Sequence, residues 1–255
     1  MSTDTENMVS KTASKRKIFP VSVDQTPSRE IVVCQRLSKI YISGEIEVKA
    51  LDSVDLMVTH GEFVCLCGPS GSGKSTLLNL IGGLDTPTAG SVAIAGQALE
   101  GLDKDRLAEL RLYHVGIVFQ AYNLIPVLSA QENVEMVLQV QGVPKAERES
   151  RARDALGSVG LGDMADRRPG ELSGGQQQRV AVARAMASRP KLVLADEPTA
   201  NLDSKTSESL LELMRDLNST HGMTFVLSTH DPQVMSYAGR VVRLCDGRLE
   251  ADEQQ

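Results

Sequence analysis

The sequence predicts an α/β fold in which helices alternate with the strands of a mostly parallel sheet. Short apolar runs of strand length, such as residues 63–67 and 192–195, recur along the chain. Between them lie longer segments whose apolar residues follow helical spacing. Strands that alternate with helices are typical of parallel sheets, because a parallel pair needs a long crossover and a helix usually supplies it.

Composition supports a globular protein and excludes several classes. The chain has 255 residues, of which 41% are hydrophobic and 24% charged, and its net charge is −6. An acidic balance argues against a nucleic-acid-binding protein, whose footprint is usually basic. No apolar run reaches 18 residues and the first 30 residues lack the apolar core of a secretory signal, so we expect no transmembrane segment and no export signal. Four cysteines are too few for a disulfide scaffold and favour a reducing compartment.

The domain organisation follows from a change in composition near residue 30. Residues 1–29 are rich in serine and threonine and contain the basic run Lys15-Arg16-Lys17. We interpret them as a flexible tail. Residues 30–255 are expected to form one folded domain, since apolar runs of strand and helix length begin there.

Strands are expected in six places. Each is a short run rich in apolar or β-branched residues, and several are bounded by turn residues. The runs are 31–34, 63–67, 115–119, 192–195, 225–228 and 241–244. Residues 48–58 form a further apolar-rich stretch that ends at the turn His60-Gly61-Glu62.

The helices are identified by their spacing and their stop signals. Residues 75–81 repeat leucine and isoleucine at helical spacing until Gly82-Gly83. Residues 128–140 and 145–159 are polar-rich but helix-like, and 176–188 ends at Pro190. Residues 204–219 place Leu210, Leu211, Met214 and Leu217 on one face.

The segment from residue 68 to residue 76 has the pattern of a phosphate-binding loop. Glycines let backbone N–H groups approach phosphate oxygens without a Cβ in the way, and the following helix directs its positive end at them. A strand precedes the loop and a helix follows it, as this motif requires. Lys74 is expected to reach the β- and γ-phosphates, Ser75 to ligate Mg²⁺ and Thr76 to add a phosphate contact. The expected nucleotide-binding residues are Gly68, Pro69, Ser70, Gly71, Ser72, Gly73, Lys74, Ser75 and Thr76.

Two acids end the apolar run at residues 192–195. A strand end beside the phosphate loop places Asp196 near the Mg²⁺ ion. Glu197 is the next residue, so it points elsewhere and is expected to polarise the attacking water. Acids are common at exposed strand ends, and only their pairing with the phosphate loop favours the catalytic interpretation.

A second glycine-rich segment stands at the start of the helix at residues 176–188. Ser173, Gly174, Gly175 and Gln176 form another helix N-terminus suited to an anion. Ser173 is equally a good helix cap. A nucleotide needs only one phosphate loop, so two such segments in one chain call for a second role.

With these motifs in order, residues 30–247 resemble the ATP-binding subunit of ABC transporters. The resemblance implies a P-loop NTPase core with a small antiparallel β subdomain and an inserted helical subdomain at about residues 121–189. It also identifies Leu172–Gln176 as the signature motif, which faces the ATP held by a second subunit, so that two copies enclose two ATP molecules head to tail.

The resemblance assigns roles to further residues. Gln120 corresponds to the glutamine that senses the γ-phosphate and Mg²⁺, and Asp203 lies in the loop that follows the two acids and is expected at the nucleotide site. His230 corresponds to the histidine that contacts the γ-phosphate, and Tyr41 to the aromatic residue that stacks on adenine. Phe63 and Tyr113 are the other aromatic candidates for that stacking role. The implied activity is ATP hydrolysis with ATP and Mg²⁺ bound. Glu197, His230 and Gln120 are its catalytic residues, and Ser75, Gln120 and Asp196 arrange the metal.

Within the family, the chain is similar to the lipoprotein-release and macrolide-export subfamily (LolD/MacB-like). The similar stretches include residues 84–90, 115–120, 123–126 and 195–204. This implies a homodimer that recruits a separate integral-membrane permease at the cytoplasmic face of the inner membrane, for lipoprotein release or export of drugs or peptides. Two features depart from the subfamily: a longer segment before residue 30, and Ala200 where glycine is common.

Two other functions remain open at this point. The first is a cell-division or signalling ATPase scaffold that has a membrane partner but transports nothing. The second is a soluble ATPase without a membrane partner. The cargo is not readable from this chain, because cargo contacts the permease.

Overall fold

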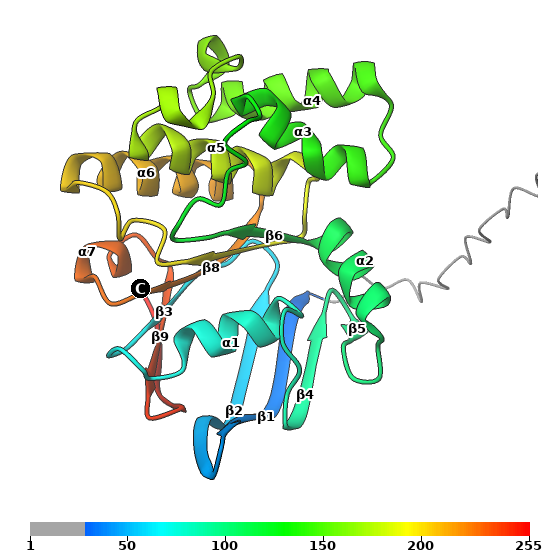
Figure 1. The fold of residues 1–255 in the computed structure, drawn as a ribbon. Coiled ribbons are helices and arrows are strands. Elements are labelled where there is room, and N and C mark those ends of the chain that lie inside the picture. Colours follow the sequence, from blue (N-terminus) through cyan, green and yellow to red (C-terminus); the bar gives the residue numbers. More distant parts are fainter. Residues whose placement is uncertain (1–28) are drawn as a thin grey trace, which may run out of the picture.

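The computed structural model describes residues 29–255. The tail predicted at residues 1–29 lies, except for Arg29, outside the described residues, and the proposed domain boundaries stay a prediction. A six-stranded sheet forms the centre of the molecule, with strand order β10-β9-β3-β8-β7-β6 (Figure 1). Its strands are β3 (Phe63–Cys67), β6 (Val115–Val118), β7 (Leu192–Asp196), β8 (Thr224–Thr229), β9 (Arg240–Cys245) and β10 (Arg248–Gln254).

Five neighbouring strands of this sheet run parallel, and β10 pairs antiparallel with β9 at one edge. Side chains of β3 alternate between two hydrophobic cores: Phe63, Cys65 and Cys67 enter one, Val64 and Leu66 the other. A parallel sheet covered on both faces requires such continuously apolar strands. Because all five side chains of β3 are buried, the segment that follows it starts from a rigid support.

A second, four-stranded antiparallel sheet has the order β2-β1-β4-β5. Its strands are β1 (Glu30–Ser43), β2 (Ile46–Thr59), β4 (Ala89–Ile94) and β5 (Gln97–Ala98). Helix α1 (Lys74–Ile81) contributes Leu77, Leu80 and Ile81 to the core that this sheet shares with the central sheet. The structure thus has the expected antiparallel β part beside the parallel core.

Most of the remaining helices cover the other face of the central sheet (Figure 1). Helices α3 (Ala130–Val140), α4 (Lys145–Ser158) and α5 (Gly174–Ala187) lie between β6 and β7 in sequence, together with the short 3-10 turns Gly162–Met164 and Pro169–Glu171. Helix α6 (Ser204–His221) follows β7, and α7 (Pro232–Met235) follows β8. Helix α2 (Lys104–His114) leads into β6. The segment predicted as a helical subdomain contains α3, α4 and α5.

The sequence pattern did not identify β2, β4, β5, β10, α2 or α7 as strands or helices, although residues 48–58 of β2 stood out as apolar-rich, and it shortened β1. Strand β10 reads Arg-Leu-Glu-Ala-Asp-Glu-Gln and has mostly exposed residues, because it forms a sheet edge. Strand β4 begins with Ala-Gly-Ser, and α2 buries only Leu107 and Leu110. These elements present little apolar periodicity, which is the signal on which the prediction depended.

Candidate active site

The phosphate loop follows β3 and ends at α1, and two of its glycines are required by close contacts. A Cβ on Gly68 would stand 2.1 Å from the Leu244 carbonyl oxygen, and one on Gly73 would stand 2.5 Å from the Ala50 oxygen. Both residues also have positive φ angles of 147° and 103°. Any other residue type at these positions would displace the loop. The cradle that the spacing predicted is therefore held from outside by β9 and by β2.

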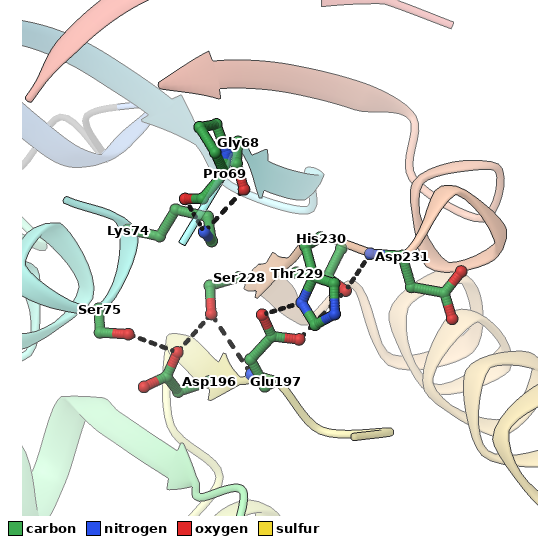
Figure 2. A network of polar contacts seen from close by, with 10 residues as sticks. All are labelled: Gly68, Pro69, Lys74, Ser75, Asp196, Glu197, Ser228, Thr229, His230 and Asp231. Carbon is green, nitrogen blue, oxygen red and sulfur yellow. Dashed lines mark hydrogen bonds and ion pairs between the residues drawn. The ribbon is translucent and has the colours of Figure 1, made fainter. Parts of the chain in front are cut away.

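Lys74 is the first residue of α1 and is 7% exposed. Its Nζ atom donates hydrogen bonds to the carbonyl oxygens of Gly68 (2.8 Å) and Pro69 (2.9 Å), as Figure 2 shows. The ammonium group therefore lies over the loop itself. An anion held in the loop would meet this charge at close range.

Two of the side chains expected at a Mg²⁺ ion, Ser75 and Asp196, lie together at the N-terminal end of α1 and the C-terminal end of β7. Ser75 Oγ on α1 donates a 3.0 Å hydrogen bond to Asp196 Oδ1 at the end of β7. Ser228 Oγ at the end of β8 bonds the same carboxylate oxygen. Hydroxyl and carboxylate oxygens are the ligands that Mg²⁺ prefers.

Glu197 turns away from Asp196, as the sequence predicts for adjacent residues. Its φ angle is +44°, a left-handed conformation that is costly for a residue with a side chain. Glu197 N donates to the Ser228 carbonyl oxygen (3.1 Å), and its carboxylate lies 2.8 Å from His230 Nδ1 and 3.4 Å from Thr229 Oγ1. The ends of β7 and β8 therefore combine the two acids with the histidine (Figure 2).

The remaining predicted residues occupy several elements. Gln120 follows β6, whose Val118 pairs with Ala195 of β7, so it lies at the same sheet end as Asp196. Its carbonyl oxygen accepts a 3.0 Å bond from Asn201 Nδ2. Asp203 caps α6 by accepting bonds from the Thr206 backbone N–H and hydroxyl, and these bonds lower its pKa. Tyr41 lies on β1 with 40% of its surface exposed.

The signature segment starts α5, and its serine has the capping role that the sequence left open. Ser173 Oγ accepts from Gln176 N, and the Gln176 side chain accepts from Ser173 N. The two glycines permit tight packing, because a Cβ on Gly174 would lie 2.9 Å from the Tyr122 hydroxyl. One on Gly175 would lie 2.2 Å from Thr206 Cγ2.

Helices α1 and α5 pack on opposite faces of the central sheet (Figure 1). The leucines of α1 belong to one core, whereas Val180 and Val182 of α5 belong to the other. Ser173–Gln176 is not part of the polar network that joins Ser75, Asp196, Glu197 and His230.

The phosphate loop and the oxygen donors beside it fit a magnesium nucleotide. The glycine cradle admits a phosphate chain, and Ser75 and Asp196 offer two hard oxygen ligands. Within residues 29–255 no group of three or more histidine, cysteine, aspartate or glutamate side chains is placed to hold a metal alone.

Comparison with known proteins decides the family. The family model described as ABC transporter matches residues 51–200, which is more than half of the chain and includes the phosphate loop and both acids. The chain belongs to the ABC transporter family. It is an ATP-binding cassette with the ATPase fold of that family.

The curated relatives are similar over most of this cassette. An uncharacterized ABC transporter ATP-binding protein of Thermotoga maritima is 51% identical over 85% of this chain and 92% of its own length. The lipoprotein-releasing system ATP-binding protein LolD of Geobacter metallireducens is 48% identical over 85% and 96%. The macrolide export ATP-binding/permease protein MacB of Marinobacter nauticus is 46% identical over 88% of this chain, and the match spans 35% of that relative.

A solved structure is similar in fold as well as in sequence. It is the dimeric, post-hydrolysis state of the ATP-binding cassette MJ0796 bound to ADP and Pi. It aligns with a TM-score of 0.82 and 45% identity, over 88% of this chain and 98% of that one. The fold class predicted from the sequence is confirmed. Among residues 29–255, none of the helices combines the length and the apolar character that crossing a membrane requires.

Three residues that position the site were not predicted from the sequence: Ser228, Thr229 and Thr206. Ser228 joins Asp196 to the backbone of Glu197, and Thr229 contacts the Glu197 carboxylate. The signal was available, since Ser228-Thr229-His230 ends an apolar strand just as Asp196-Glu197 does. Thr206, which packs at Gly175, carried no signal because its contact joins segments 31 residues apart.

Proposed function

We propose that this cassette is the ATP-hydrolysing subunit of a transporter, working as a homodimer on a separate integral-membrane permease. The observation that supports it most is the meeting of Ser75, Asp196, Glu197 and His230 at one end of the central sheet. Phosphoryl transfer demands chiefly positioning and charge stabilisation, and these residues supply both.

In the proposed reaction, ATP and water give ADP and phosphate. Lys74 and the loop N–H groups bind the phosphate chain, and Ser75, Asp196 and Gln120 orient the metal. Mg²⁺, when bound, neutralises charge on the β- and γ-phosphates. Glu197 orients the attacking water, and the contact between its carboxylate and His230 Nδ1 fixes the direction in which the carboxylate points. The other ring nitrogen of His230 remains available to contact the γ-phosphate.

The dimer is proposed because a cassette carries two phosphate-seeking helix starts on opposite faces of its sheet. In a head-to-tail pair, Ser173, Gly174 and Gly175 of one copy would meet the γ-phosphate bound at Lys74 of the other. Loss of that phosphate removes the anion that joins the copies, so the interface weakens after hydrolysis. The similarity to a dimeric cassette with ADP and Pi supports this arrangement.

A groove beside Gln120 is the proposed permease site. Its volume is about 370 Å³, and it is lined mainly by apolar side chains from α2, β6, α3 and α5. Leu112, Ile117, Phe119, Met136 and Val137 are among them. An amphipathic helix of a permease fits such a groove. Asn123, three residues after Gln120, also lines the groove, so the groove continues along the segment that follows Gln120.

The test uses tagged full-length Glu197→Gln protein with ATP and Mg²⁺. We expect it to form dimers, measured by light scattering, and to capture from detergent-solubilised source membranes a permease with a large extracytoplasmic domain. Val137→Glu in the groove is the matched variant, expected to dimerise equally and to lose the permease. If the Glu197→Gln protein dimerises but captures only soluble proteins, the permease proposal is contradicted and the soluble ATPase is the remaining alternative.

The class of transport is the finer part of the proposal. The similarity to LolD and MacB proteins supports lipoprotein release or macrolide-type export at the cytoplasmic face of the membrane. A captured permease whose deletion impairs envelope lipoprotein sorting would favour the first, and one whose deletion raises drug sensitivity would favour the second. Deletion with a cell-division or signalling defect and no transport defect would favour the scaffold alternative.

A further inference from the structure

Tyr41 is held by a polar network of residues to which the family motifs assign no role. Its hydroxyl donates a 2.9 Å hydrogen bond to Asp85 Oδ2. Lys39 Nζ donates to the other carboxylate oxygen, Asp85 Oδ1, at 2.7 Å and to the Thr86 carbonyl oxygen at 2.8 Å. Asp85 is therefore shared between the phenol and a buried ammonium group.

The same network defines one face of the Tyr41 ring. Lys39 Nζ stands 4.9 Å from the ring centroid, a cation–π distance. The Lys39 side chain is only 11% exposed, whereas Tyr41 retains 40% of its surface. One face of the ring thus rests on an enclosed cation, and the exposed part of the ring is free to receive a flat partner.

The carboxylate also connects the ring to the phosphate loop. Asp85 lies just beyond α1, and the N–H groups of Leu84 and Asp85 donate to the Asn79 carbonyl oxygen of that helix. Helix α1 begins at Lys74. The ring is therefore anchored to the C-terminal end of the helix whose N-terminal end faces the phosphates.

The protonation states agree with this arrangement near neutral pH. Burial and the bond to Asp85 raise the pKa of Tyr41, so the phenol remains a donor. Burial would raise the pKa of Asp85, but the bonds from Lys39, the Thr86 N–H and Tyr41 outweigh it and lower that pKa. The carboxylate is ionised and accepts all three donors.

We propose that Asp85 and Lys39 are positioning residues that hold the Tyr41 ring as a fixed stacking surface for a purine base. This inference rests on the proposed nucleotide site and adds to it a determinant of base selectivity. A ring fixed in advance loses little freedom when a base stacks on it, and the larger purine gains more from stacking than a pyrimidine.

The test separates base binding from phosphate binding in the full-length chain. Equilibrium dissociation constants are measured for ATP, CTP and inorganic tripolyphosphate, which enters the phosphate loop but carries no base. For Asp85→Ala we expect ATP to bind about tenfold more weakly, the effect of losing a charged hydrogen bond. Tripolyphosphate affinity stays unchanged, the preference for ATP over CTP shrinks, and kcat at saturating ATP stays within about twofold of wild type.

Two further variants make the result independent of folding defects at residue 85. Lys39→Met keeps a long unbranched side chain but removes its charge, and should reproduce the loss of ATP affinity. Tyr41→Ala should weaken ATP binding by itself, and Asp85→Ala added to it should cause no further loss, because the ring it positions is gone. Asp55→Ala is the control, since Asp55 is exposed and fastens the same strand through the Arg36 N–H without touching Tyr41.

Three outcomes overturn the inference. The first is unchanged ATP affinity in folded Asp85→Ala and Lys39→Met proteins. The second is an equal loss of affinity for ATP and for tripolyphosphate. The third is that Asp85→Ala lowers ATP affinity in the Tyr41→Ala background by as much as it does alone. A wild-type chain that binds neither ATP nor tripolyphosphate is a different failure. It refutes the proposed nucleotide site, and this inference fails with it.

Discussion

Helices α1 and α5 both begin at a glycine-rich segment that contains serine, yet their N-terminal ends are capped in different ways. At α1 the capping residue is Gly73, in the left-handed conformation and without any side-chain bond. At α5 the cap is Ser173, which exchanges bonds with Gln176. The first helix has no side-chain cap and leaves its N–H groups for a ligand in the same chain, whereas the cap of the second already occupies the Gln176 N–H group.

The difference has a structural cause. The loop before α1 is confined by Leu244 and Ala50, so its glycines adopt conformations that direct the backbone inward. Gly174 and Gly175, the first two residues of α5, are confined instead by Tyr122 and Thr206, which fix where the helix lies. Glycine serves phosphate access at one site and close helix packing at the other.

The largest expected effect is on kcat, from a substitution that removes the catalytic carboxylate beside the α1 site but leaves the phosphate loop intact. Glu197→Gln removes the carboxylate that orients water and should lower kcat about a thousandfold, within the usual range for general-base loss. ATP affinity should remain, because Lys74 and the loop are intact. A phosphate-release assay measures kcat, and equilibrium binding of ATP measures the affinity. Hydrolysis at the wild-type rate would exclude Glu197 from this role.

Lys74→Met removes the ammonium that lies over the loop. We expect ATP and tripolyphosphate to bind about a hundredfold more weakly, because two or more charged hydrogen bonds to phosphate are lost. Lys104→Met at the start of α2 replaces a lysine remote from the loop, and it should bind normally. Equal binding by both variants would show that the phosphates lie elsewhere.

Gly175→Ala tests whether the α5 glycines serve packing. The new methyl group would stand 2.2 Å from Thr206 Cγ2, so we expect a loss of about 1–3 kcal/mol in the free energy of unfolding. Thr206→Ser removes that methyl group and keeps the hydroxyl that bonds Asp203, so it should restore much of the loss. Denaturant unfolding of the two single variants and the double variant provides the values. An unstable double variant would contradict the packing explanation.

The smallest expected effect comes from Ser173→Ala. Loss of the cap should cost about 1 kcal/mol of unfolding free energy. ATP affinity of the monomer should not change, since Ser173 is outside the α1 network, while hydrolysis by the dimer should fall about tenfold. Light scattering with ATP in the Glu197→Gln background reports the dimer. Weaker ATP binding by the monomer would contradict the division of roles between the two helices.

The sequence was most informative where apolar runs and glycines have a single physical meaning. The bounds of β3 agree with the prediction, as does the strand–loop–helix order at Gly68. The pairing of Asp196 and Glu197 at a strand end also appears as expected. Edge strand β10 and helix α2 were not predictable, because their residues are mostly exposed and their periodicity is weak.

The sequence by itself determined the chemistry of this protein: the phosphate loop, the two acids and His230 stand at strand ends that a parallel sheet must bring to one edge. Only the tertiary structure decided which groups hold them. Ser228 joins the two acids, and Asp85 and Lys39 fix Tyr41, through contacts between segments far apart in the chain. Periodicity reports which face of an element is buried, but a contact between distant side chains depends on how the elements pack.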